Sequence, residues 1–110
     1  WEAAVLEQLL EVLERSFSRL DVDWSNKLRV VWNDAKGNVL VELATKRREG
    51  PLLSIYTAPG AIAPGQIADL GSKRVIEPHR SGQDAVRIQF NEVQEILPDQ
   101  LAKLLQSALK

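Results

Sequence analysis

A chain of 110 residues has the length of one domain, and an apolar content of 45% is enough for a single core. It contains no cysteine, which excludes a disulfide framework and a thiolate metal site. The formal net charge of −1 hides an uneven distribution: residues 1–23 hold six acids against two bases, and residues 24–90 hold ten bases against six acids. An electropositive surface is therefore possible over the middle of the chain.

The first predicted element is an amphipathic helix over residues 2–20. Large apolar residues recur there at three- and four-residue spacing, with glutamates between them. The positions expected to face a sheet are Leu6, Leu9, Leu10, Leu13, Phe17 and Leu20. The acidic polar face argues against binding to an anionic membrane surface. Because the helical pattern begins at Trp1, we expect the chain to be a segment of a longer protein.

Three strands joined by two polar turns are predicted between residues 27 and 57. The expected buried face consists of Leu28, Val30 and Trp32 in the first strand, and of Val39, Val41 and Leu43 in the second. We expect Trp24 to be in the core as well. On the opposite face, Glu42 is placed to pair with Arg29. The third strand spans Leu52–Thr57, and the turn before it, residues 46–50, is the densest cluster of positive charge in the chain.

Turn chemistry dominates the next segment, because residues 58–65 contain two Pro-Gly pairs. Residues 66–70 predict a short helical turn that ends at Gly71 and returns the chain to a sheet edge. Two more strands are predicted at Lys73–Glu77 and Asp84–Asn91, joined by a turn over residues 78–83. A closing helix then begins at Pro98 and places Leu101, Leu104, Leu105, Ala108 and Leu109 on one side.

These elements predict one α+β domain over residues 1–110. Its sheet is five-stranded and mostly antiparallel, with the N- and C-terminal helices packed on one face, in the order α-β-β-β-(short α)-β-β-α. The longest apolar runs are only a few residues, and there is no signal-peptide pattern. We therefore expect a soluble, cytoplasmic protein without a membrane partner; the pattern fixes no oligomeric state.

Groups for catalysis are sparse. The single histidine, His79, forms a serine-triad constellation only with Ser81 and Asp84, and all three fall within six residues of one predicted hairpin, which is typical of turn chemistry. No metal-ligand spacing and no phosphate-binding loop is present. We therefore expect no enzymatic activity, no cofactor and no metal. A small enzyme would instead require a pocket in which Tyr56, His79 and Asp84 converge.

Binding is the remaining class of function, because basic residues occupy turns, strand ends and predicted wet faces. The candidate nucleic-acid contacts are Arg29, Lys46, Arg47, Arg48, Lys73, Arg74, Arg80 and Arg87. Phosphate recognition needs several such groups on one surface. The alternative is that these residues only solvate turns and blunt exposed sheet edges. Exposed aromatic residues are few, which disfavours a platform for stacking single-stranded bases.

A rival interpretation from another class is a protein-interaction or dimerisation domain without a nucleic-acid role. Apolar residues at predicted outward strand positions, Val31, Leu40 and Leu52, motivate it. Such a domain would pair through an exposed strand edge or through the apolar side of the terminal helix.

Three segments carry a family resemblance: the VELATKR run from Val41 to Arg47, the Pro-Gly loop with the IADLG motif up to Gly71, and the fifth strand with the leucine-rich helix after it. Together they resemble the C-terminal accessory domain of some bacterial proteins similar to the A subunit of excinuclease ABC, particularly in planctomycetes. The resemblance implies a module attached to a DNA-repair ATPase. ATP hydrolysis and zinc binding would then belong to the rest of that protein. The TKR and IADLG motifs have no catalytic role that can be carried over to this chain.

Overall fold

The computed structural model of the protein describes residues 3–16, 21–23, 29–33, 36–45, 50–80 and 82–108. For residues 3, 21–23, 29 and 80 it describes the backbone. Several residues singled out in the sequence lie outside the described part, namely Phe17, Leu20, Trp24, Leu28, Ser81, Leu109 and the basic residues Lys46, Arg47 and Arg48.

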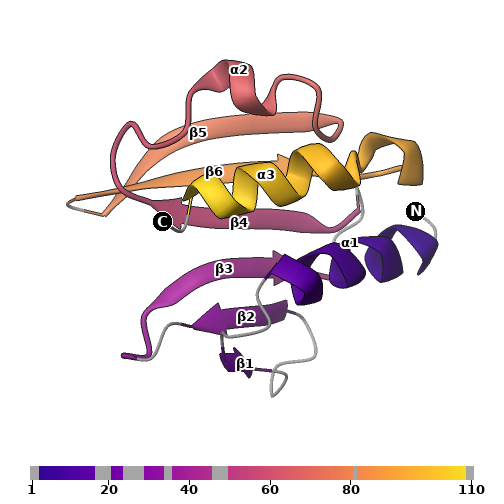
Figure 1. Cartoon of the computed structure of the whole chain (residues 1–110), viewed down its shortest axis with the longest axis horizontal. Helices are drawn as coiled ribbons and strands as arrows, with labels where there is room; N and C mark the ends of the chain where they lie inside the picture. The colour runs from indigo at the N-terminus through magenta and orange to yellow at the C-terminus, as the bar shows by residue number, and fades with distance from the viewer. Residues whose placement is uncertain are drawn as a thin grey trace.

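The chain forms three α-helices, six strands and one 3₁₀-helix in its described part (Figure 1). In order they are α1 (Ala3–Ser16), β1 (Asp21–Asp23), β2 (Arg29–Asn33), β3 (Val39–Ala44), β4 (Leu52–Thr57), α2 (Pro64–Ile67), β5 (Lys73–Arg80), β6 (Gln83–Gln89), η1 (Val93–Glu95) and α3 (Pro98–Ala108).

All neighbouring strands are antiparallel, and their spatial order is β1-β2-β3-β4-β6-β5. After β4, the chain passes through α2 to the sheet edge, where it forms β5, and β6 then fills the place between β5 and β4. The predicted α+β class, the antiparallel sheet and the helices at both ends are confirmed, as is the return to a sheet edge after the short helix.

Two details of the strands differ from the sequence prediction. Residues 21–23, which follow the predicted first helix and were assigned to no strand, form a sixth strand whose Val22 is paired with Trp32 of β2. The fourth predicted strand is longer than expected, because β5 continues through Pro78 to Arg80 where a turn was predicted. Proline can occupy this position since β5 is an edge strand, where a missing backbone donor breaks no ladder.

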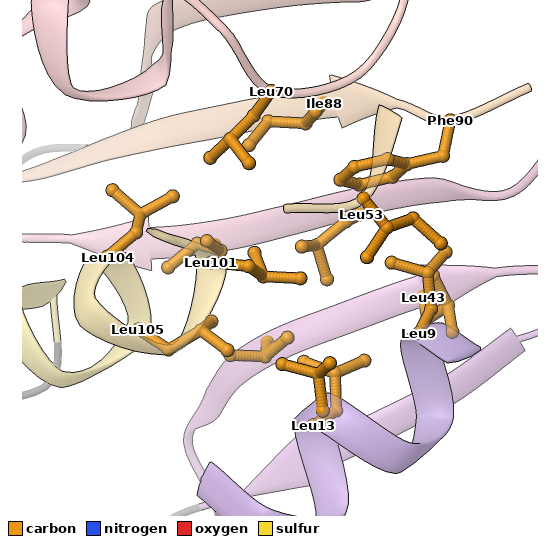
Figure 2. Packing of buried hydrophobic residues seen from close by; sticks show 14 of the residues in the cluster. Leu9, Leu13, Leu43, Leu53, Leu70, Ile88, Phe90, Leu101, Leu104 and Leu105 are labelled. Atoms are coloured by element: carbon orange, nitrogen blue, oxygen red, sulfur yellow. The ribbon is translucent and has the colours of Figure 1, made fainter. Parts of the chain in front are cut away.

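The core lies between the sheet and the pair of helices α1 and α3, which contact each other and cover the same face (Figure 1). Figure 2 shows leucines of both helices pointing towards Leu43, Leu53, Ile88 and Phe90. Alternate strand residues supply the sheet side of this layer, as period-two patterning requires. On this side of the sheet, the fully buried strand residues are Trp32, Val41, Leu43, Leu53, Ile55, Val86 and Ile88.

The predicted buried face of β3 is wrong at one position, Val39. The β2–β3 register shifts by one residue next to Asn33, so Trp32 is paired with Val41 and Asn33 with Val39. The extra residue is Leu40, which packs against the core, while Val39 is 38% exposed. A bulge of this kind turns one side chain to the opposite face of a strand.

Candidate functional site

We call the face of the sheet opposite α1 and α3 the open face, because the described helices pack on the other side. Pairing places two adjacent rows of residues across it. The first row is Val31, Glu42, Ser54, Arg87 and Val75, and the second includes Tyr56, Ala85 and Glu77. The first row has three polar side chains between two valines, one of them acidic and one basic, so the open face is polar but not uniformly basic.

Tyr56 is the aromatic residue at the centre of the open face. Its ring is buried, with 8% exposed, although no helix covers it. Its hydroxyl donates a 2.8 Å hydrogen bond to Glu42 Oε2 on the neighbouring strand β3. Burial raises the pKa of the Tyr56 phenol, and the hydrogen bond to Glu42 and its negative charge raise it further, whereas Arg87 acts to lower it. Tyr56 is therefore held as a neutral hydrogen-bond donor near neutral pH.

The single tyrosine makes this pKa directly measurable. In a spectrophotometric titration of the folded protein, we expect the phenolate to form above the usual tyrosine pKa of about 10. The Glu42→Gln variant should titrate at lower pH because it loses the negative charge, but burial should keep its pKa raised. Stability linked to Tyr56 is complete below about pH 10 and is lost as pH rises through the folded pKa. A midpoint equal to that of the unfolded chain would contradict the Tyr56–Glu42 contact.

His79 lies over Tyr56 because of a second bulge. The β5–β6 register pairs Pro78 with Asp84 and Arg80 with Gln83, which leaves His79 as the extra residue. The two rings have centroids 4.5 Å apart and planes inclined by 33°, within the usual range for aromatic pairs. Strand β6 separates the two residues, and Ala85, opposite Tyr56, is small enough for His79 to reach across. The bulge therefore places the exposed imidazole of His79 against the buried phenol ring of Tyr56.

Arg87 links three strands on the same face. Its Nη1 donates to Ser54 Oγ at 2.9 Å, and its Nε donates to Glu77 Oε1 at 2.9 Å. This covers Ser54, which is 3% exposed. An ion pair at this degree of exposure contributes at most about 1 kcal/mol, but it offsets the charge of Arg87. The guanidinium therefore stiffens the open face more than it adds positive potential.

A pocket of about 490 Å³ lies on the open face beside the Tyr56–His79 pair. Its walls come from the turn Gly37–Asn38 and from five neighbouring strands, in the order β2, β3, β4, β6 and β5. The side chains that define it are Val31, Val39, Glu42, Tyr56, His79 and Gln83. Both bulges contribute to it, since one turns Val39 towards it and the other positions His79. Bulges often re-aim side chains at functional sites.

The described basic candidates do not gather in one patch. Lys73 is exposed in the row that holds Gln89 and Leu52 on the open face. Its neighbour Arg74 belongs to the core side, opposite Ile88, and its Nη1 donates to the carbonyl oxygens of Leu70 and Gly71 at 3.2 and 3.1 Å. Because successive residues of a strand face opposite sides, Lys73 and Arg74 lie on different faces of the sheet. Arg87 is on the open face, but its charge is offset by its ion pair with Glu77.

The remaining candidates are described only by backbone position or lie outside the described residues. Arg29 is paired with Ala44 at the end of the sheet that also holds Lys73, whereas Arg80 is at the opposite end. Lys46, Arg47 and Arg48 are not described, but the residues on either side of their segment, Thr45 and Gly50, adjoin the ends of β3 and β4 nearest Arg29. The predicted Glu42–Arg29 pair involves a side chain outside the described part; the register places Glu42 opposite Val31 and Arg29 opposite Ala44.

The small-enzyme alternative requires Tyr56, His79 and Asp84 to converge, and the structure brings two of them together; Ser81 of the considered triad lies outside the described residues. Tyr56 and His79 converge, but Asp84 Oδ2 accepts a 3.0 Å hydrogen bond from the Gly60 amide and does not line the pocket. Among the described residues, no three His, Asp or Glu side chains are grouped to hold a metal ion. None of the helices in the described part is long and apolar enough to span a bilayer.

Sequence reasoning did not identify Glu42 and Gln83 as pocket residues, and it did not predict the Tyr56–His79 stack. The turn-like composition of residues 78–83 concealed the strand that carries His79. The available signal was the pair of polar residues Glu42 and Ser54 within two mostly apolar strands. Such residues indicate a wet face with side chains that interact across strands.

The β5 edge is poorly suited to pairing with another strand. Pro78 lacks a backbone donor, the His79 bulge interrupts the ladder, and Lys73 adds a charge at its start. Natural sheets use these features to block edge-to-edge association. Although Val75 in this strand is 46% exposed, the β5 edge therefore does not support the hypothesis that the domain dimerises by strand pairing.

Comparisons of the chain with protein-family models, curated proteins and solved structures gave no match. Function must therefore be inferred from the open face itself.

Proposed function

We propose that this protein is a non-catalytic binding module that contacts nucleic acid through one end of the open face. The observation that supports the proposal is the row formed by Arg29, Ala44, Leu52, Gln89 and Lys73. It crosses five strands, a span of about 19 Å at the usual strand spacing. Duplex DNA presents about ten phosphate charges over that length.

The segment with the highest density of basic residues adjoins this row in sequence. Thr45 and Gly50, which bracket residues 46–49, follow β3 and precede β4 at the end where Arg29 and Lys73 occur. Two basic residues in one row and three more in the adjoining stretch of sequence suit a polyanion better than a small anion, because each phosphate contact releases a counterion. The described acids on the same face, Glu42 and Glu77, lie farther along their strands.

The resemblance to the accessory domains of excinuclease-like proteins suggests which nucleic acid to test first. We propose that the module belongs to a DNA-repair protein and meets duplex DNA as an auxiliary contact. An acidic protein surface is the other partner that the same cations would suit, and a parallel titration with an acidic peptide distinguishes the two.

The test is duplex binding measured by fluorescence anisotropy across a salt series. Affinity should fall steeply with salt, and the K46A/R47A/R48A variant should show a slope of log K against log salt that is smaller by about 0.9 for each phosphate that the variant no longer neutralises. Lys73→Ala should reduce the slope by up to one such step. Lys103→Ala is the matched control, because Lys103 is exposed on α3, which packs on the opposite face of the sheet. Binding that is independent of salt, or equal in all variants, would reject the proposal.

A further inference from the structure

The pocket on the open face has the size and mixed chemistry of a site for a small planar ligand. Its volume of about 490 Å³ is within the usual range for ligand pockets. Val31 and Val39 provide apolar wall, whereas Glu42 and Gln83 provide hydrogen-bonding groups. A ligand that suits this site is flat and partly apolar, and it has a polar edge.

The Tyr56–His79 pair supplies the surface for stacking. His79 is exposed, and its ring is supported from beneath by Tyr56, which is in turn fixed by its hydrogen bond to Glu42. Histidine is one of the side chains on which unpaired nucleobases stack in proteins. Because its support is buried and hydrogen-bonded, little conformational freedom remains to be lost when a base stacks on it.

The carboxylate of Glu42 supplies a directional acceptor beside that surface. An ionised carboxylate accepts at about four lone-pair sites and donates none, so it can accept several hydrogen bonds at once, among them the one from the Tyr56 hydroxyl. Carboxylates pair with the exocyclic amino group of cytosine for this reason. The amide of Gln83 can donate to a ring or carbonyl acceptor of the same base.

We propose that this pocket binds an unpaired nucleobase that carries an amino group, stacked on His79 and hydrogen-bonded to Glu42. Uracil and thymine are disfavoured, because their carbonyl oxygen would face the carboxylate where cytosine places its amino group. This inference rests on the proposed nucleic-acid function and goes beyond duplex contact, because the pocket would take a base only where the strands are separated or the nucleotide is unpaired. The test uses free nucleosides, which lack phosphate, so it does not depend on the basic row.

The experiment compares cytidine with uridine, which differ by this amino group and carbonyl oxygen. One histidine and one tyrosine make the ring-proton NMR signals of His79 and Tyr56 simple to assign. We expect cytidine to shift the His79 signals upfield in a saturable manner, as stacking on a ring does. Uridine should bind about tenfold more weakly or worse.

Two variants separate the roles of the residues. Glu42→Gln should lower the ratio of cytidine to uridine affinity about tenfold, because an amide can donate to the uridine carbonyl. His79→Ala should weaken both nucleosides about tenfold, since it removes the stacking surface. Asp69→Asn is the control: Asp69 is an exposed carboxylate between α2 and β5, outside the pocket, and its loss should change neither affinity.

Equal affinities for the two nucleosides, full binding by His79→Ala, or no saturable shift with either nucleoside would overturn the inference. A protein that binds duplex DNA in a salt-dependent manner but ignores cytidine would reject the pocket and keep the basic row. A cytidine preference without salt-dependent duplex binding would reject the row and keep the pocket.

Discussion

Replacing Phe90 with alanine is expected to destabilise the fold by about 3 to 5 kcal/mol. Phe90 follows β6 and is completely buried. Figure 2 shows its ring in the core near Leu53 and Ile88, on the side that faces the helices. The truncation removes apolar contacts and leaves a cavity that rigid strands on either side can fill only in part. A domain of this size is stabilised by about 5 to 15 kcal/mol in total.

Urea denaturation followed by tryptophan fluorescence measures this loss, and the melting temperature should fall by more than about 10 °C. Val93→Ala is the matched control, because Val93 is only three residues away but 38% exposed. Its effect should stay within about 0.5 kcal/mol. If the Phe90 variant lost less than about 1 kcal/mol, the packing of this part of the core would be contradicted.

The sheet core could be predicted because its strands alternate strictly where one face is buried. In β4 and β6, Leu53, Ile55, Val86 and Ile88 occupy every second position, and all four are inaccessible to solvent. A slip of one residue would move each of them from the helix-covered face to the open face, so the pattern fixes the facing of these strands. Trp32 is buried for the same reason, between the sheet and the helices.

Alternation was uninformative at the two bulges. Val39, Leu40 and Val41 are consecutive apolar residues, so the sequence accommodates either facing, and only pairing with β2 reveals that Leu40 is the extra residue. Around Pro78 and His79 the composition is that of a turn, yet the antiparallel partner β6 keeps the segment extended. Both features depend on a neighbouring strand, which local propensity does not include.

The candidate site depends on the same long-range pairing. Charge counting grouped Lys73 with Arg74 because they are adjacent in sequence, but strand geometry places them on opposite faces. Conversely, Glu42, Tyr56 and His79 are far apart in sequence and meet only because β3, β4, β6 and β5 are neighbours in the sheet. Composition could thus indicate a basic middle of the chain, but not which side chains share a surface.

Replacing Gly50 with alanine is expected to cost more than about 3 kcal/mol, for two reasons that add. Gly50 is buried with φ of 109°, a conformation that costs an L-residue about 1 to 3 kcal/mol. In addition, a Cβ atom there would overlap the carbonyl oxygen of Phe90. Relief requires separation of the backbone at Gly50 from the end of β6, where Phe90 N donates to Pro51 O and Gln89 Nε2 donates to Gly50 O.

Gly37→Ala separates these two causes. Gly37 also has a positive φ, 82°, but a Cβ atom there meets nothing within 4 Å. This variant should therefore lose only the conformational part, about 1 kcal/mol. Chemical denaturation of both variants gives the difference, which measures the close approach between the start of β4 and the end of β6. Equal losses would mean that Gly50 is required for its backbone conformation alone and that Phe90 can yield.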